Sequence, residues 1–145
     1  AFTAQEEVGL RGAQTVAFAI QPEYAIAVDV TDTGDLPERK YPMAVKMGEG
    51  PAVKIMDHSV ICDQQVKQTL YRVAQENDIP VQREIMEFGG TDTGAIQRTA
   101  GGVKVGAVSI PTRYIHSAAE MANLRDVEQA IRLIAHAVSD GMDKT

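Results

Sequence analysis

The stretch Tyr24-Ala25-Ile26-Ala27-Val28-Asp29-Val30 decides the fold class of this 145-residue chain. It is a continuous apolar run of strand length, interrupted only by Asp29 near its end, rather than an alternation of apolar and polar side chains. Such runs are typical of strands that are buried on both faces, as in parallel sheets covered by helices. The run therefore predicts a buried strand with helical segments on either side of it.

Helical and strand-like patterns alternate along the rest of the chain, without an internal repeat or a domain linker. In chain order we expect a strand over 1–4, a helix over 10–20, strands over 24–30 and 52–56, a helix after residue 57, a strand over 81–86, a short helix ending near Gly101, a strand over 103–110 and a final helix ended by Gly141. This alternation predicts a single α/β domain, with a layered, mixed and largely parallel sheet flanked by helices.

Two of these helices have a clear apolar face. Either Asp57 or Ser59 is a candidate N-cap for the helix after residue 57, and Asn123 and Asp126 resemble a capping box at the start of the final helix. The expected inward residues are Cys62, Val66, Leu70 and Val73 in the first of these helices, and Leu124, Val127, Ile131, Ile134 and Val138 in the final one.

Composition narrows the class of partner. Hydrophobic residues make up 44% of the chain and charged residues 23%, as in a globular protein, and the formal net charge is -6. An acidic protein is poorly suited to nucleic acid or to anionic membrane, so a peptide, small-molecule or metal ligand fits better. There is no membrane-spanning run, and the single cysteine, Cys62, excludes an internal disulfide and predicts a cytoplasmic location.

Glu6 and Glu7 stand where the apolar run 1–4 gives way to a helical segment. Consecutive side chains of a strand point to opposite faces, so the two acids serve one site only if the turn into the helix brings both round. There, one carboxylate could hold a metal ion while the other takes a proton from water. The alternative is that both acids simply stabilise the start of the helix through its dipole.

Asp29 and His116 are further candidate metal ligands, because both are expected where strands end. A carboxylate in an apolar run is costly to bury unless it is hydrogen-bonded, ion-paired or bound to a metal. Imidazole is a common ligand of zinc. The alternatives are that Asp29 caps the loop 31–34 and that His116 is an ordinary solvated loop residue.

The turn Gly89-Gly90-Thr91-Asp92 opens the short helix. Backbone N–H groups at such a turn can bind an anion or a substrate carbonyl, which makes Gly90, Thr91 and Asp92 candidate substrate-binding residues. The turn lacks the lysine of a phosphate-binding loop and the spacing of a dinucleotide fingerprint. The alternative is that Thr91 or Asp92 is an ordinary N-cap.

Four stretches, spread over nearly all of the chain, together match a known pattern. They are 3–13 (TAQEEVGLRGA), 27–31 (AVDVT), 89–92 (GGTD) and 110–117 (IPTRYIHS). In this order they resemble the signature motifs of the glutamyl aminopeptidase and endoglucanase-like metallopeptidases, the family that includes the tetrahedral aminopeptidases. Each motif alone is weak, but four in order are specific.

The resemblance implies a zinc-peptidase-like catalytic domain that removes N-terminal residues from peptides with two divalent metal ions, zinc or cobalt. Glu6 would be the general base acting on the metal-bridging water. Glu7 and His116 would bind one metal, Asp29 would bind the other, and the turn 89–92 would line the substrate side. Homo-oligomers, up to dodecamers, are also implied.

The resemblance also implies ligands that this chain does not contain. Family members carry a further histidine and a metal-bridging aspartate before the Glu-Glu motif, whereas this chain starts at Ala1, without Met and on a strand-like run. We therefore expect residues 1–145 to be the C-terminal portion of one catalytic domain, inactive when isolated. The substrate's N-terminal residue and the physiological metal stay open.

Two other functions are compatible with the sequence. The missing ligands would suit a catalytically silent binding or assembly module that keeps the fold. The endoglucanase name of some relatives suggests glycoside hydrolysis instead, but two adjacent glutamates do not naturally give facing carboxylates about 5 to 9 Å apart, as glycosidases need.

Overall fold

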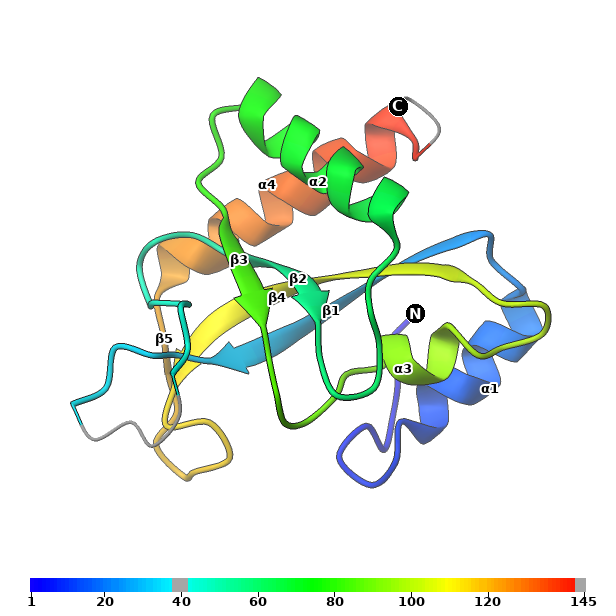
Figure 1. The fold of residues 1–145 in the computed structure, drawn as a ribbon, viewed down its shortest axis with the longest axis horizontal. Helices are drawn as coiled ribbons and strands as arrows, with labels where there is room; N and C mark the ends of the chain where they lie inside the picture. The colour runs from blue at the N-terminus through cyan, green and yellow to red at the C-terminus, as the bar shows by residue number, and fades with distance from the viewer. Residues whose placement is uncertain (38–41, 143–145) are drawn as a thin grey trace.

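The computed structural model describes residues 1–37 and 42–142 and places a mixed sheet at the centre of the fold, with helices on both sides (Figure 1). The elements in chain order are α1 (Arg11–Ile20), β1 (Tyr24–Asp32), β2 (Ala52–Met56), α2 (Gln64–Glu76), β3 (Gln82–Ile85), α3 (Thr93–Ile96), β4 (Lys104–Arg113), β5 (Met121–Ala122) and α4 (Leu124–Asp140). The predicted α/β fold class is therefore confirmed, although α3 is shorter and β4 longer than the sequence indicates.

The sheet has the strand order β1-β4-β2-β3, and β5 pairs with the end of β4. β1 runs parallel to β4 in continuous register, from Tyr24 opposite Lys104 to Asp32 opposite Thr112. β2 is parallel to β3 but antiparallel to β4, which makes the sheet mixed. Within the described residues β1 pairs only with β4, so this strand forms an edge.

The prediction that β1 is buried on both faces is wrong for part of the strand. Val28 and Val30 are exposed, whereas Ala27 and Thr31 are buried. The cause is that α2 and α4, which cover the face of the sheet that carries Val28 and Val30, pack mainly on β2 and β4, so alternate side chains at the end of β1 stay without cover in the described structure. Asp29 and Thr31 share the opposite face because they are two residues apart.

The main core lies between the sheet and the helices α2 and α4, which pack side by side over one side of the sheet (Figure 1). It joins Val53 and Val108 of the sheet to buried side chains of both helices: Val66, Leu70, Val73, Ala130, Leu133 and Ala137. Helices α1 and α3 cover the opposite side. Burial of this apolar surface is the main stabilising contribution to the fold.

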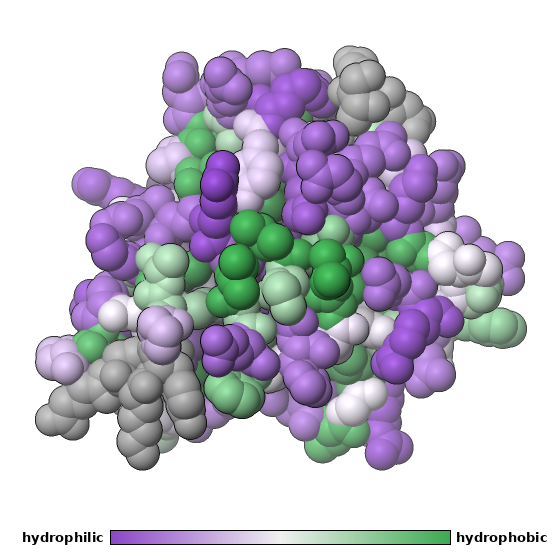
Figure 2. Space-filling view, in the orientation of Figure 1, coloured by the Kyte–Doolittle hydropathy of each residue, from purple (hydrophilic) through white to green (hydrophobic). Residues whose placement is uncertain are grey.

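The predicted inward face of α4 is wrong in three of its five positions. Leu124, Ile131 and Val138 are exposed, and the residues that face the core are Ala130, Leu133 and Ala137. Alanine side chains allow the axis of α4 to lie close to its neighbours. A prediction from hydropathy alone places the larger apolar residues on the inward face instead. Figure 2 shows further apolar surface at the middle of the face it presents, over β2 and β3. Ile85 of β3 and Ile61, which forms a bridge with Met56 of β2, are exposed.

Residues 1–4 do not form the expected strand. Phe2 is fully exposed, and the carbonyl oxygen of Ala4 accepts a hydrogen bond from the Gly12 N–H rather than from a neighbouring strand. An apolar run becomes a strand only where its backbone groups find a ladder partner, and the described structure places none beside this segment.

The helix caps also differ from the predictions. Asp63, and not Asp57 or Ser59, caps α2 by accepting from the Gln65 and Val66 N–H groups. Asn123 does cap α4, accepting from Arg125 N–H at 3.0 Å. Asp126 is no part of a capping box; it is buried and bonded elsewhere. None of the described helices is long and apolar enough to cross a membrane.

Candidate active site

One open pocket of about 500 Å³ gathers five of the seven predicted site residues. Its polar lining includes Glu6, Glu7, Asp29, Gly90 and His116. These residues come from four separate parts of the chain: the turn before α1, strand β1, the loop after β3 and the loop after β4. The apolar part of the lining is Leu10, Val30, Met86, Phe88 and Ile115.

The turn before α1 brings both glutamates to this pocket. The carbonyl oxygen of Glu6 accepts from the N–H groups of Gly9 and Leu10, at 3.1 and 2.9 Å, which closes the turn. Gly9 has φ +116° and Leu10 has φ 55°, so the chain reverses sharply here. The turn thus has the effect expected from the sequence, although no strand precedes it.

Asp29 lies inside β1 rather than at its end, because the strand continues to Asp32. Its Oδ1 atom accepts from the Val30 N–H at 2.8 Å. Burial raises the pKa of Asp29, and this backbone hydrogen bond and the ammonium of Lys54 oppose the increase. Asp29 is therefore a partly buried carboxylate that faces the pocket from the sheet.

His116 is held by an unusual backbone on the loop after β4. Tyr114 and His116 have φ of 59° and 60°, a left-handed conformation that costs a non-glycine residue about 1 to 3 kcal/mol. The N–H of His116 donates to Glu120 Oε1 at 2.6 Å. Strain of this kind clusters at functional sites, where it fixes the direction of a side chain.

The imidazole of His116 meets Glu7, with Nε2 3.2 Å from Oε1. The two side chains are 68% and 73% exposed, so the pair contributes little to stability. Two ligands on one tetrahedral zinc ion, with bonds of about 2.0 to 2.1 Å, are about 3.3 Å apart. The separation of these atoms therefore fits shared binding of one metal ion.

Several carboxylates repel one another in this pocket. Burial raises the pKa of Glu6, and the negative charges of Asp29, Glu7 and Asp92 raise it further, while His116 opposes them. A group whose pKa is raised by like charges in a cleft is a candidate general base or a neighbour of a cation. Glu6 is one such group, and Asp29, whose pKa is raised chiefly by burial, is another.

The donors do not form a complete metal site. Within residues 1–37 and 42–142, no group of three or more histidine, cysteine or acidic side chains converges on one point. Glu7 and His116 supply two donors and Asp29 supplies one at a separate place. Their chemistry suits zinc or cobalt, but a closed coordination sphere would need donors that these residues do not provide.

The three candidate substrate-binding residues of the glycine turn (residues 89–92) do not line the same pocket. Gly90 lines the pocket, whereas the hydroxyl of Thr91 is buried and bonds Thr93 Oγ1 at 2.6 Å. Asp92 Oδ2 accepts from Thr3 Oγ1 at 2.6 Å and lines a different cavity. Neither Thr91 nor Asp92 lines the candidate site. Asp92 acts on it through its negative charge, which raises the pKa of Glu6.

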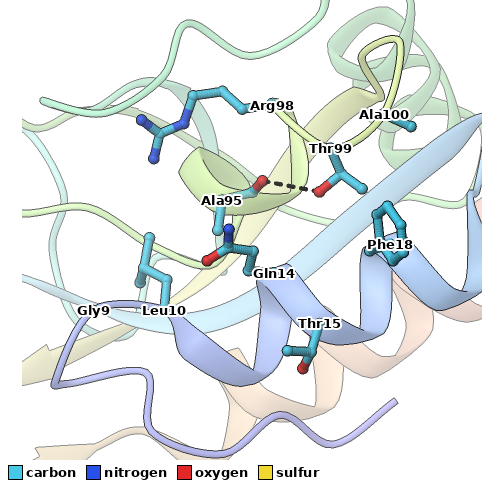
Figure 3. Close-up of a pocket in the computed structure, with 9 residues that line it drawn as sticks. All are labelled: Gly9, Leu10, Gln14, Thr15, Phe18, Ala95, Arg98, Thr99 and Ala100. Atoms are coloured by element: carbon cyan, nitrogen blue, oxygen red, sulfur yellow. Dashed lines mark hydrogen bonds between the residues drawn. The ribbon is translucent and has the colours of Figure 1, made fainter.

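A larger cavity of about 810 Å³ adjoins this pocket between α1 and α3 (Figure 3). Leu10 lines both cavities and so marks the boundary between them. Arg98 donates to the Gly94 carbonyl at 2.8 Å and Thr99 donates to the Ala95 carbonyl at 3.2 Å, so these two side chains satisfy backbone groups of α3. The titratable groups gather in the smaller pocket.

The sequence did not reveal a buried ionic network beneath the pocket. Lys54 of β2 is fully buried and lies 2.6 Å from Glu84 Oε1 and 3.6 Å from Asp57 Oδ2. In the sequence, Lys54 and Glu84 look like the outward residues of two short strands. A charged residue at the middle of each of two neighbouring strands is the one signal that could have indicated the pair.

One known family matches the chain over most of its length. The family model for M42 glutamyl aminopeptidases matches residues 1–133. The chain belongs to this family. A candidate aminopeptidase of Acetivibrio thermocellus is 56% identical over 137 residues, which are 94% of this chain and 41% of that protein.

Solved structures of family members have the same fold. An aminopeptidase from Desulfurococcus kamchatkensis superimposes with a TM-score of 0.88 and 41% identity, over 94% of this chain and 39% of that one. The TET1 peptidase of Pyrococcus horikoshii, which can assemble into a tetrahedron or a large octahedral shell, superimposes with a TM-score of 0.79 and 36% identity, over 94% of this chain and 39% of that one. This M42 chain thus spans about two fifths of the length of these relatives.

Proposed function

We propose that this chain supplies the general base and three metal ligands of a metal-dependent aminopeptidase that removes N-terminal residues from peptides. The observation that carries the proposal is the meeting of Glu6 with the Glu7–His116 pair in one pocket, with Asp29 beside them. Family membership supports the class of reaction.

Each residue has a distinct role in this proposal. Glu7 and His116 would hold one divalent ion and Asp29 the other, with zinc or cobalt as the ions that suit these donors. When bound, the ions would polarise the substrate carbonyl and lower the pKa of water. Glu6 binds neither ion; it takes a proton from water and returns it to the departing amine.

The pocket also accounts for the class of substrate. A peptide with a free N-terminus brings an ammonium group, which is attracted by the negative charge of the carboxylates in the pocket. The apolar wall of Leu10, Val30, Met86, Phe88 and Ile115 offers a place for a neighbouring side chain. Peptides are therefore the proposed substrates, and nucleic acid and membrane are not proposed partners.

Assembly into a homo-oligomer, up to a dodecamer, is part of the same proposal. It is supported by the tetrahedral assembly of the Pyrococcus horikoshii relative, which is similar over 94% of this chain. A cytoplasmic location stays a prediction that rests on the single unpaired cysteine, Cys62.

The test is Glu6→Gln, which keeps the size of the side chain but cannot accept the proton. With a complementary N-terminal segment present, we expect turnover of leucine p-nitroanilide to fall about 10² to 10⁴-fold, with the metal content per chain unchanged by elemental analysis. Glu23→Gln is the matched control, because Glu23 does not line the pocket and should keep full activity. Full activity in Glu6→Gln would refute the assignment of the base.

A second candidate function is a catalytically silent module that keeps the fold. The observation that favours it is the incomplete set of donors around Glu7 and His116. Metal content decides between the two: about two ions per chain with turnover supports the enzyme. One ion or none, without turnover even after a complementary N-terminal segment is added, supports the silent module.

A further inference from the structure

Lys54 places a positive charge inside the protein, beneath the candidate active site. The side chain is fully buried, and its ammonium lies 2.6 Å from Glu84 Oε1 and 3.6 Å from Asp57 Oδ2. Burying three charges is expensive, and well-packed apolar side chains of similar volume are often equally stable or more stable. Stability alone therefore gives no reason for this cluster.

One branch of the cluster leads to the strand that carries Asp29. Glu84 Oε1, the atom that binds Lys54, also accepts from Thr31 Oγ1 at 2.8 Å. Thr31 follows Asp29 by two residues on β1, so both side chains lie on the same face of the strand. The Lys54–Glu84 pair thus fixes the strand next to Asp29.

The other branch leads to the glycine turn. Asp57 Oδ1 accepts from the Ser59 N–H at 2.8 Å, the Ser59 hydroxyl at 2.7 Å and the Val60 N–H at 3.0 Å. Asp57 Oδ2 faces Thr91 Oγ1 at 3.5 Å. The turn after β2 is therefore held by hydrogen bonds to Asp57, the carboxylate that also faces Lys54.

Close packing couples the turn after β2 to the glycine turn, which lines the pocket. A Cβ atom at Gly90 would lie 3.0 Å from Ser59 Oγ, and one at Gly94 would lie 2.4 Å from it. The His58 N–H donates to the Gly89 carbonyl at 3.2 Å. A shift of the turn after β2 would therefore move the glycine turn with it.

We propose that Lys54 and Glu84 are positioning residues, which hold Asp29 and the glycine turn at a fixed separation across the active site. This inference rests on the proposed function, because it concerns the geometry of that site. Neither side chain touches the substrate. Both act through Thr31 on one side and through Asp57 and Thr91 on the other.

The experiment compares two substitutions of nearly equal size at Glu84. Glu84→Gln keeps an oxygen that can accept from both Lys54 and Thr31, whereas Glu84→Leu has none. Lys54→Met tests the other partner. Leu70→Ala, in the core between the sheet and α2, is the control for general loss of stability, because Leu70 is fully buried away from the network. Thermal unfolding confirms that each variant is folded at the assay temperature.

The first readout is hydrolysis of leucine p-nitroanilide, measured with a complementary N-terminal segment present. We expect Glu84→Leu and Lys54→Met to lower kcat about 10- to 100-fold with KM changed by less than about threefold, because small displacements of catalytic groups act on kcat. Glu84→Gln should restore most of kcat. Leu70→Ala should lower the unfolding midpoint but keep kcat.

The second readout does not depend on activity. It is the hydrogen exchange, followed by NMR, of the Val30 N–H, which donates to Asp29, and of the Gly94 N–H, which donates to the Thr91 carbonyl. We expect exchange of both amides to be at least about tenfold faster in Glu84→Leu, and close to wild type in Glu84→Gln.

The outcomes separate this inference from the proposed function. A folded Glu84→Leu protein with wild-type kcat, or a Leu70→Ala protein with the same loss of kcat, would overturn the positioning role while the aminopeptidase stands. No turnover of the wild-type protein with a complementary N-terminal segment present would overturn the proposed function. Hydrogen exchange alone would then decide, and unchanged exchange at Val30 and Gly94 in Glu84→Leu would overturn the network. If Lys54→Met does not fold, the pair of substitutions at Glu84 decides.

Discussion

Replacing Asp35 with asparagine should destabilise the protein at neutral pH and much less in acid. Arg113 donates to this carboxylate from Nη2 at 2.6 Å and from Nε at 3.2 Å, a bidentate pair. The Met47 N–H donates to the same carboxylate at 3.3 Å. Hydrogen bonding and charge from Arg113 lower the pKa of Asp35 from 3.8 to about 2. The pair connects the loop after β1 to the end of β4, three residues before His116.

The size of the expected loss of stability follows from the lowered pKa of Asp35. A decrease of nearly two units corresponds to at most about 2.4 kcal/mol, at 1.36 kcal/mol per unit. The side chain of Asp35 is 17% exposed and that of Arg113 is 30% exposed, so solvent screening reduces the figure to about 1 to 2 kcal/mol. Because the pKa is lowered on folding, the stabilisation is fully present above pH 3.8. It disappears as the pH falls through about 2.

The assay is urea unfolding of the wild type and Asp35→Asn, followed by circular dichroism between pH 7 and pH 3. The difference in free energy of unfolding should be about 1 to 2 kcal/mol at pH 7 and about half of that at pH 3. Glu49→Gln is the matched control, since its pair with Lys46 is 55% and 57% exposed and should matter by less than about 0.5 kcal/mol. A difference that does not change with pH would refute the reasoning.

Three further predictions concern other parts of the fold. Asp126→Asn should cost about 1 to 3 kcal/mol in urea unfolding, because the buried carboxylate accepts from two N–H groups of the turn 48–50, at 2.7 and 2.9 Å. Gly106→Ala should cost about 1 to 3 kcal/mol, since the added Cβ would lie 2.5 Å from Val66 Cγ1; an unchanged unfolding midpoint would contradict the packing. Cys62, whose pKa is raised by burial to about 11, should resist iodoacetamide at pH 8 until the protein unfolds, because only about one thiol in a thousand is ionised. Rapid labelling of the folded protein, measured by mass spectrometry, would contradict that pKa.

From α1 to α4, the order of the helices and of every strand except β5 could be predicted from the sequence because it depends on local patterns, whereas the strand predicted over 1–4 does not form. The run from Tyr24 to Val30 and the strand around Val105 are apolar over strand lengths, and glycine or proline stands between most elements. Strand pairing is not local, and nothing in the sequence indicated that β2 would run antiparallel to β4. The face of α4 was predicted wrongly, because hydropathy favours Leu124 over Ala130 although the small side chain allows close packing.

The sequence predicted the position of some residues of the candidate site but not of others. Glu6, Glu7, Asp29, Gly90 and His116 do line one pocket, as expected from acids and an imidazole near the ends of elements and from the family resemblance. Their roles stay predictions. The directions of Thr91 and Asp92 could not be predicted, because a turn of four residues can point each side chain either way.

The candidate site lies apart from the main core, so an effect on turnover can be measured separately from an effect on stability. The large buried side chains lie between the sheet and α2 and α4, whereas Glu7 and His116 are mostly exposed and belong to loops. Removing an exposed charge rarely changes stability by more than about 0.5 kcal/mol. Removing one of several mutually repelling carboxylates relieves repulsion, so Glu6→Gln and Glu7→Gln should unfold no earlier than the wild type without metal. A loss of turnover in these variants then reports on chemistry, whereas a loss in Lys54→Met requires the separate stability control, because that charge is fully buried.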